Sequence, residues 1–163
     1  AKYCKLIHAV DVSKAMIDYA SQKAKNMGVE NVIFHHGGFL TYEHQEDPVD
    51  AIVCAAVLHH LPDFWKLVGL RRIFEMLRPN GIFFLFDVVF PSDIPDYGNR
   101  FDTWIQTTVR EVGANFALEA ESHIRDEYST FDWIMEGLLE RAGFHINNAQ
   151  YLDRFGATYI CTK

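Results

Sequence analysis

The order in which strand-like and helix-like segments follow one another is the feature of this chain that most constrains its fold. Short apolar runs alternate with segments whose apolar residues recur at helical spacing, which is typical of a parallel sheet with helices on both faces. The run 82–89 has the strongest strand pattern and is expected near the sheet centre. The predicted strands are 6–10, 31–35, 49–54, 82–89, 144–149 and 158–162, and the predicted helices start after Ser13, at Asp63 and at Phe131.

Residues that commonly begin or end helices stand at the predicted boundaries. Hydroxyl and carboxylate side chains accept hydrogen bonds from the free N–H groups at a helix start, and glycine tolerates the left-handed backbone at a helix end. The predicted start signals are Ser13, Asp63 and the pair Ser129 and Asp132, and the predicted end signals are Gly28, the turn 79–81 and Gly143.

The last two predicted strands have no helix between them. Parallel neighbours need a crossover of about a dozen residues, and only a short loop through Asp153 and Gly156 separates these two strands. We therefore predict an antiparallel hairpin at one edge. The expected fold class is α/β, a three-layer sandwich with a mostly parallel sheet and a terminal antiparallel strand.

Composition narrows the class of protein further. The 163 residues suffice for one domain with a full core, and the net charge of −7 argues against a general nucleic-acid binder. Cys4, Cys54 and Cys161 are widely spaced and form no CxxC motif, which favours reduced thiols and a cytoplasmic location. The apolar run 82–90 contains Asp87 and is far shorter than the roughly 20 residues of a membrane helix, so we expect no membrane partner.

Asp11 is the first candidate binding residue, because it ends a strand-like run just before a helix cap. In nucleotide-binding α/β folds a carboxylate in that place accepts hydrogen bonds from ribose hydroxyls, about 20 residues after a glycine-rich turn. Only ten residues precede Asp11 in this sequence, so a glycine-rich turn at that distance would lie before Ala1. The alternative is that Asp11 only assists the helix cap at Ser13.

Four segments, in this order, resemble motifs of the class I S-adenosylmethionine-dependent methyltransferases, which have a Rossmann-like fold. The match covers residue 6 to about residue 90, and then 129–163. The ribose-binding turn of the family resembles Val10-Asp11-Val12-Ser13, and its adenine-binding turn resembles Gly37-Gly38-Phe39-Leu40. The family's fourth strand with its loop resembles Asp50 to Leu61, and the entry to its fifth strand resembles Leu77-Arg78-Pro79-Asn80-Gly81-Ile82.

The resemblance implies a cofactor, S-adenosylmethionine, and a place for each part of it. Asp11 and Val12 would contact the ribose, Gly38 and Phe39 the adenine, and Cys54 with Ala55 the methionine end. The family often has an acidic residue where Gly38 stands, so one adenine contact is missing; a plain glycine turn with a core phenylalanine is the alternative. The small residues at 54–56 also suit ordinary packing.

His59 is the candidate catalytic residue, as a general base for a protonated acceptor. The alternative is that it caps or packs its loop. Neither His59-His60 nor His35-His36 has the spacing that places two ligands on one helical face, so we expect no metal site.

The family's first strand and glycine-rich loop have no counterpart here, and residues 1–4 resemble the last turn of the helix after that loop. We therefore expect one methyltransferase-like domain over 1–163 that is incomplete at its N-terminus. The absent central strand would leave unpaired edges that invite association, so a homodimer is among the expected partners.

Residues 91–128 have no match to the family core and are expected to form a helical lid or substrate wall. Arg100, Trp104 and Arg125 are the candidate substrate contacts, in a segment that also carries Arg110, Phe116, His123 and Tyr128. A helical pair that only packs on the sheet is the alternative. The predicted function is methyl transfer to a small molecule; a nicotinamide-dependent oxidoreductase and a non-catalytic self-associating domain are the alternatives.

Overall fold

The computed structural model describes residues 1–152 and 155–163, without the side chains of residues 114, 116, 117 and 119. Asp153 of the predicted closing loop and the side chain of Phe116 therefore lie outside the described part of the chain. The chain divides into two compact units, Ala1–Asp47 (unit 1) and Pro48–Lys163 (unit 2). Each unit is described by itself.

Unit 1 is a strand-helix-strand unit made of β1 (Ile7–Asp11), α1 (Lys14–Asn26) and β2 (Val32–His36). The two strands pair in parallel, from Ile7 opposite Val32 to Asp11 opposite His36. Ser13 caps α1 as predicted, because its hydroxyl accepts a hydrogen bond from the N–H of Met16. The parallel pairing brings the carboxyl ends of β1 and β2 to one edge of this small sheet.

Unit 2 contains a mixed sheet in which β4 is an interior strand, as predicted. The strand order is β3-β4-β7-β6, and β5 pairs with the far end of β4. β3 and β5 run parallel to β4, whereas β7 is antiparallel to both β4 and β6. The predicted closing hairpin is thereby confirmed, with β6 at the edge. The strands are β3 (Val49–Ala55), β4 (Leu77–Phe90), β5 (Thr130–Phe131), β6 (His145–Leu152) and β7 (Gly156–Thr162).

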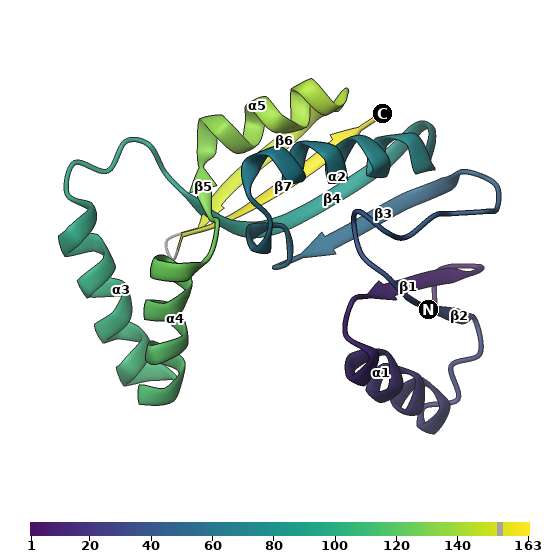
Figure 1. Ribbon diagram of the computed structural model, residues 1–163, viewed down its shortest axis with the longest axis horizontal. Coiled ribbons are helices and arrows are strands. Elements are labelled where there is room, and N and C mark those ends of the chain that lie inside the picture. The colour runs from purple at the N-terminus through teal and green to yellow at the C-terminus, as the bar shows by residue number, and fades with distance from the viewer. Residues whose placement is uncertain (153–154) are drawn as a thin grey trace. The chain divides into compact units, whose positions relative to one another are not determined.

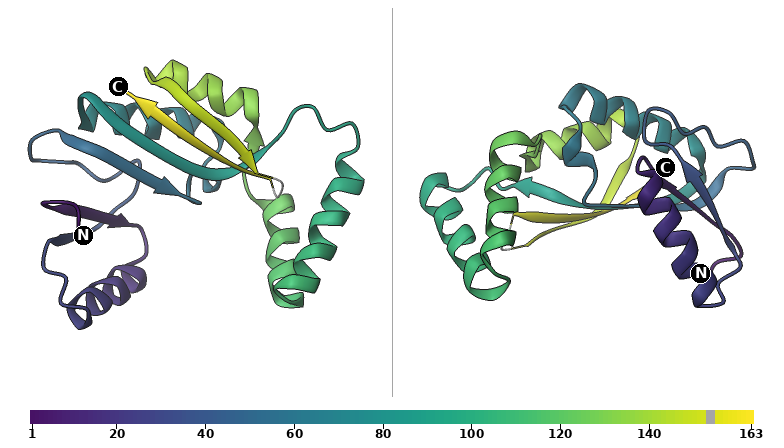
Figure 2. Two further views of the ribbon diagram at one scale, coloured as in Figure 1. Left: turned by 180° about the vertical axis from the view of Figure 1, so that it is seen from behind. Right: turned by 60° about the horizontal axis from the view of Figure 1, so that its bottom comes forward.

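Helices α2 (Asp63–Met76) and α5 (Asp132–Ala142) pack against each other and cover one face of the unit 2 sheet (Figures 1 and 2). Burial alternates along β4, so that Leu85 and Val89 are fully buried, whereas Phe86 and Val88 are half-buried. Asp87 follows the same alternation and is also fully buried. A carboxylate therefore stands inside the apolar core.

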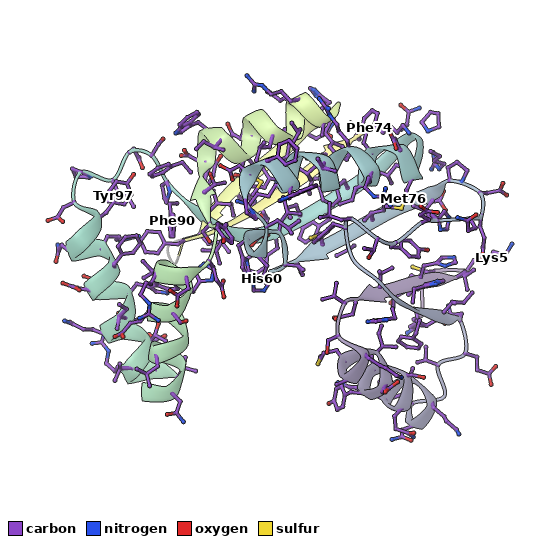
Figure 3. All side chains as sticks on the ribbon, viewed as in Figure 1. Lys5, His60, Phe74, Met76, Phe90 and Tyr97 are labelled. Atoms are coloured by element: carbon purple, nitrogen blue, oxygen red, sulfur yellow. The ribbon has the colours of Figure 1, made fainter. Side chains whose placement is uncertain are left out.

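Residues 97–126 form a pair of helices, α3 (Tyr97–Glu111) and α4 (Ala114–Asp126), that pack side by side and project from one end of unit 2 (Figure 1). Aromatic rings join the base of α3 to the sheet. Phe90 and Tyr97, labelled in Figure 3, both contact Phe101, with ring centroids 5.4 and 6.2 Å apart. The predicted helical character of residues 91–128 is thus present, while its role as a lid stays a prediction.

Three boundary predictions were wrong. Asp63 is the first residue of α2 and not its cap; its carboxylate instead accepts a hydrogen bond from Lys66. Neither Ser129 nor Asp132 is the cap residue of α5. Asp132 is the first residue of the helix and accepts hydrogen bonds from Ser92 and from the N–H of Trp133, whereas Ser129 contacts His123. Asp63 and Ser129 thus bind other side chains and not the free N–H groups of the helix start.

The predicted turn at residues 79–81 is a bulge within β4. Between Val49 and Ala51 of β3 the paired residue on β4 advances from Leu77 to Ile82, and Asn80 has a left-handed φ of 59°. Gly28 and Gly143 have the positive φ expected just after a helix. Among the described residues, no helix combines the length and apolar character needed to cross a membrane.

Candidate functional site

The carboxyl ends of β1 and β2 bring three of the predicted cofactor residues together in unit 1. One carboxylate oxygen of Asp11 accepts a hydrogen bond from the N–H of Ser13 at 2.7 Å, and the Asp11 carbonyl accepts one from the N–H of Gly37 at 3.0 Å. Across the edge, a Cβ placed on Gly38 would lie 2.5 Å from Cγ1 of Val12. Glycine at position 38 thus allows the two loops to pack closely.

The second oxygen of the Asp11 carboxylate has no hydrogen bond in the part of the chain that the structure describes. Asp11 is half-buried and Val12 is largely exposed, as expected of groups at an open edge. Asp11 therefore assists the helix cap, as the alternative proposed, and still has one free acceptor. Phe39 lies in the next turn, which hydrogen bonds from Thr41 and Tyr42 to the Gly38 carbonyl close.

The end of β3 in unit 2 carries the small residues predicted to lie near the cofactor's methionine end. Cys54 is buried, and burial together with the nearby Asp87 raises the pKa of its thiol to about 12. Ala55 is exposed, and Ala56 has a left-handed φ of 53°. Non-glycine residues in that conformation are strained, and such strain often occurs at functional sites.

His59 follows this turn and is held by the buried carboxylate of Asp87. The residue lies in the short 3-10 helix η1 (Leu58–His60), and its Nδ1 forms a short contact with one oxygen of Asp87. The other Asp87 oxygen accepts a hydrogen bond from the N–H of Leu58 at 2.7 Å. Since Nδ1 is occupied, the Nε2 atom of His59 is the ring nitrogen available for other partners.

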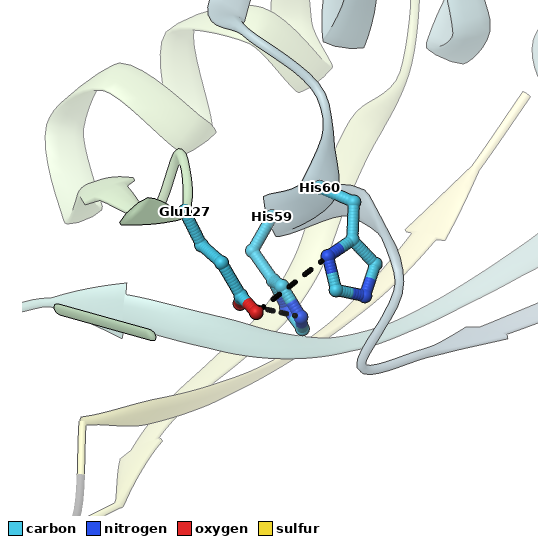
Figure 4. Close-up of side chains that lie close together, drawn as sticks. All are labelled: His59, His60 and Glu127. Carbon is cyan, nitrogen blue, oxygen red and sulfur yellow. Dashed lines mark ion pairs between the residues drawn. The ribbon is translucent and has the colours of Figure 1, made fainter. Parts of the chain in front are cut away.

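That nitrogen faces a second carboxylate, Glu127, just after α4 (Figure 4). Nε2 of His59 lies 3.3 Å from Glu127 Oε2, and Nδ1 of His60 lies 3.9 Å from Glu127 Oε1. Nδ1 of His123 also contacts Glu127 Oε2, and its Nε2 lies 2.7 Å from the hydroxyl of Ser129. Burial lowers the pKa of His123, while the charge of Glu127 acts in the opposite direction.

Two backbone contacts hold the Glu127 segment beside η1. The N–H of Tyr128 donates to the carbonyl of His59 at 2.8 Å, and the ammonium of Lys66 donates to the carbonyl of Tyr128. Lys66 is fully buried on α2 and also donates to Asp63 at 2.8 Å. The cluster is therefore assembled from η1, β4 and the end of α4, with α2 as its support.

The predicted substrate residues do not join this cluster. Arg100 lies over the ring of Phe155 at 5.9 Å, and the ring of Trp104 contacts the same phenylalanine at 5.3 Å. Arg125 is exposed and pairs with Asp126 at 2.8 Å. The positions of Asp87 and Glu127 in this cluster were not predicted from the sequence. For Asp87 the available signal was an acidic residue inside the strongest apolar strand.

Comparisons with known proteins identify the family and the fold of this chain. A family model described as a methyltransferase domain matches residues 1–81. The chain is 37% identical over 146 residues to the uncharacterized methyltransferase YcgJ of Bacillus subtilis, an alignment that covers 88% of this chain and 48% of that protein. The chain thus spans about half the length of this relative.

Two solved structures show that the fold is shared at low sequence identity. The N-methyltransferase NodS from Bradyrhizobium japonicum, in complex with S-adenosyl-l-homocysteine, matches with a TM-score of 0.68 and 16% identity, covering 100% of this chain and 69% of that one. The cyclase SpnF matches with a TM-score of 0.69 and 16% identity, covering 97% and 66%. At such identity the likeness concerns the fold alone, and a cyclase on this fold shows that the scaffold permits other chemistry.

Proposed function

Through residues 1–81 this chain belongs to the methyltransferase domain family with the class I, Rossmann-like fold, and from that premise we propose that it transfers a methyl group from S-adenosylmethionine to a small molecule. The donor supplies a methyl group that is already activated on a sulfonium. The protein's own contribution is then mainly to bind, align and exclude water.

The free carboxylate oxygen of Asp11 is the observation that best supports this proposal. One Asp11 oxygen already accepts the Ser13 N–H at 2.7 Å, which orients the carboxylate and leaves its second oxygen for a ribose hydroxyl. A charge-assisted hydrogen bond from a hydroxyl to such an oxygen is stronger than a neutral one. Asp11 would therefore hold the sugar of the cofactor, beside Val12.

The neighbouring turn suits an adenine ring. Gly38 packs against Val12 so closely that any side chain there would displace it, and Phe39 follows in a half-buried position. Phe39 and the backbone of this turn would bound the ring. In unit 2, Cys54 and Ala55 at the end of β3 would face the methionine portion, where small side chains permit close approach.

On the acceptor side, we assign His59 to the removal of the acceptor's proton. Asp87 holds Nδ1 and leaves Nε2 as the reactive nitrogen, an arrangement that suits a general base. Arg100, Trp104 and Arg125 on α3 and α4 would contribute to a wall for the substrate. Arg100 and Arg125 are exposed, and Trp104 is half-buried.

We also place the protein in the cytoplasm and expect no nucleic-acid partner. Three cysteines without a disulfide support the first assignment, and the net charge of −7 supports the second. A homodimer is consistent with β1, which pairs only with β2 among the described residues and so presents a free strand edge.

Calorimetric titration of the full protein with S-adenosylhomocysteine tests the proposal. Asp11→Asn should weaken binding by roughly 10- to 100-fold, because it removes the charge that strengthens the ribose hydrogen bond. Asp18→Asn is the matched control, since Asp18 is exposed on α1 and its partner among the described residues is Lys14, at 3.2 Å. The control should bind as the parent does.

Parallel titration with NADH separates the alternatives. Binding of NADH without binding of S-adenosylhomocysteine would replace the proposal with an oxidoreductase. Equal affinity of Asp11→Asn and the parent for S-adenosylhomocysteine would remove Asp11 from the site. No binding of either ligand would favour a non-catalytic domain.

A further inference from the structure

The side chains of His59, His60 and Glu127 converge on one small volume (Figure 4). Their nearest nitrogen and oxygen atoms all lie within 4.8 Å of one another. The distances from Glu127 oxygens to His59 Nε2 and His60 Nδ1, 3.3 and 3.9 Å, are close to the separation of neighbouring ligand atoms around a single ion. Ligand bonds of about 2.0–2.2 Å in a tetrahedral zinc site place neighbouring ligand atoms roughly 3.3–3.6 Å apart.

Asp87 gives His59 the outer support that metal-bound histidines usually have. Such a histidine donates its second ring N–H to a carboxylate or carbonyl, which orients the ring and raises the basicity of the ligating nitrogen. Here the fully buried Asp87 contacts Nδ1 of His59, and N–H groups of Leu58 and Val88 hold the carboxylate at 2.7 and 2.8 Å. The Nε2 atom is therefore directed at Glu127 before any ion arrives.

Glu127 has an unsatisfied oxygen inside the cluster. Its Oε2 atom is buried and makes no hydrogen bond of acceptable geometry within the described residues, although His59 and His123 both approach it. A buried carboxylate oxygen without a hydrogen bond destabilises the fold, because it has lost its water without gaining a partner. A cation between the carboxylate and the imidazoles would remove this destabilisation.

We propose that His59 Nε2, His60 Nδ1 and the Glu127 carboxylate bind one divalent ion of the zinc class. Two imidazoles and one carboxylate suit zinc and its first-row neighbours better than magnesium or calcium, which prefer oxygen ligands alone. Three protein ligands leave a fourth position open, on the side where His60 is 57% exposed. His123 stands close enough to Glu127 to support or complete the set.

The ion would change how the acceptor is activated, a consequence that rests on the proposed methyl transfer. A metal and a proton compete for the same Nε2 lone pair, so metal-bound His59 does not act as a base. An oxygen or sulfur acceptor that enters the open position would instead give its proton to solvent water more readily, because the cation stabilises the anion that forms. Metal binding itself is independent of the methyl donor.

Competition titration of Zn²⁺ against a chromophoric chelator, on the full protein freed of metal by dialysis, tests the proposal. The expected result is one tight site per chain. Glu127→Gln and His60→Gln should each weaken binding at least about 10-fold, and Asp87→Asn by roughly 10- to 100-fold through its effect on His59. His60→Gln is informative even if the buried variants unfold, since the His60 side chain is largely exposed.

The matched controls are His8→Gln and His44→Gln, which alter a second histidine cluster in unit 1, where the two rings lie 5.0 Å apart. They should leave the affinity unchanged. Co²⁺ in place of Zn²⁺ should give the visible absorption bands of a four-coordinate ion, and these bands should be absent in Glu127→Gln. Absence of a tight site, or an equal loss in the controls, would overturn the proposal. S-adenosylhomocysteine titration of the same samples reports separately on the proposed function.

Discussion

Units 1 and 2 contain similar elements and differ completely in burial. Every residue of 1–47 is at least partly exposed, whereas unit 2 has a core that includes Leu58, Leu70, Phe83 and Leu85 at 0% exposure. In unit 1 large apolar side chains such as Met16 stay about half exposed. Periodicity and capping are therefore enough to define the elements of unit 1, while the buried residues among those that the structure describes belong to unit 2.

The comparison also separates two kinds of site. The residues assigned to the ribose and adenine lie on loops of the loosely packed unit, where the backbone has few buried contacts to restrain it. The His59 cluster lies on a tightly packed sheet, where Asp87 and Lys66 are fully buried. We expect binding at Asp11 to order its surroundings, and binding at His59 to use a site that is already ordered.

Thiol reactivity should show the largest difference between the units. Cys4 in unit 1 is exposed, whereas burial raises the pKa of Cys54 and of Cys161 to about 12 from 9.0. A thiol with a pKa of about 12 has a roughly 1,000-fold smaller thiolate fraction at a given pH than one with a pKa of 9.0. The thiolate is the reactive species. Ellman's reagent at about pH 8 should therefore label one thiol quickly and two slowly, and Cys4→Ser should abolish the fast phase. Three equal rates would contradict the assignment of the core.

Truncation of core side chains should give the next largest difference. Leu85→Ala removes a fully buried side chain from β4 and should lower the free energy of unfolding by about 2–5 kcal/mol. Met16→Ala, at a position that is 51% exposed, should change it by less than about 0.5 kcal/mol. Urea denaturation followed by circular dichroism measures both. A large cost for Met16→Ala would indicate that another surface covers α1 in solution.

Much of this fold could be predicted because its elements carry local signals. Alternation, the Ser13 cap and the short final connection predicted the parallel pairs and the closing hairpin. Asp63 and Ser129 were misassigned because a side chain binds its best available partner, and Lys66 and His123 were those partners. Such choices depend on packing that local sequence does not contain.

The site could be predicted only in part, for a similar reason. His59 was identified from its place after a strand, and Asp11 from the strand before a cap. Glu127 comes from the end of α4, 68 positions after His59 in the sequence, and no motif spacing connects them. The metal-ligand spacing rules apply to single helices, so they overlooked a cluster built from η1 and a distant segment.

Hydrogen exchange should reveal a difference in backbone amide protection between the strands of the two units. The amide of Leu85 lies in a strand paired on both sides, whereas Ala9 lies in a two-stranded sheet. The amide of Leu85 should exchange at least roughly 100-fold more slowly than that of Ala9. Exposure of the Leu85 amide to water requires the core of unit 2 to unfold, whereas exposure of the Ala9 amide does not. Addition of S-adenosylhomocysteine should slow exchange at Val12 and Ser13 without affecting Leu85. Equal protection of the two strands would show that unit 1 is as tightly held as unit 2.

The smallest expected effect is a pH dependence of unit 1 that comes from His35. Burial lowers the pKa of His35 below 6.5, the neighbouring His8 and His44 lower it further, and Glu46 opposes them. The ring of His35 also contacts that of Tyr42 in a tilted arrangement, with centroids 5.0 Å apart. The folded state therefore binds fewer protons at this residue than the unfolded state does, so stability is retained above pH 6.5 and is lost as the pH falls through the lowered pKa.

Thermal unfolding between about pH 5 and about pH 8 measures this contribution. His35→Gln should reduce the loss of thermal stability on the acidic side. His145→Gln, which removes an exposed histidine from β6, should leave that loss unchanged. Because His35 is only half-buried, we expect a small change in slope and not a separate transition. NMR titration of the histidine ring signals should give His35 a lower pKa than an exposed histidine. A His35 pKa above 6.5 would reverse the predicted direction of the pH dependence.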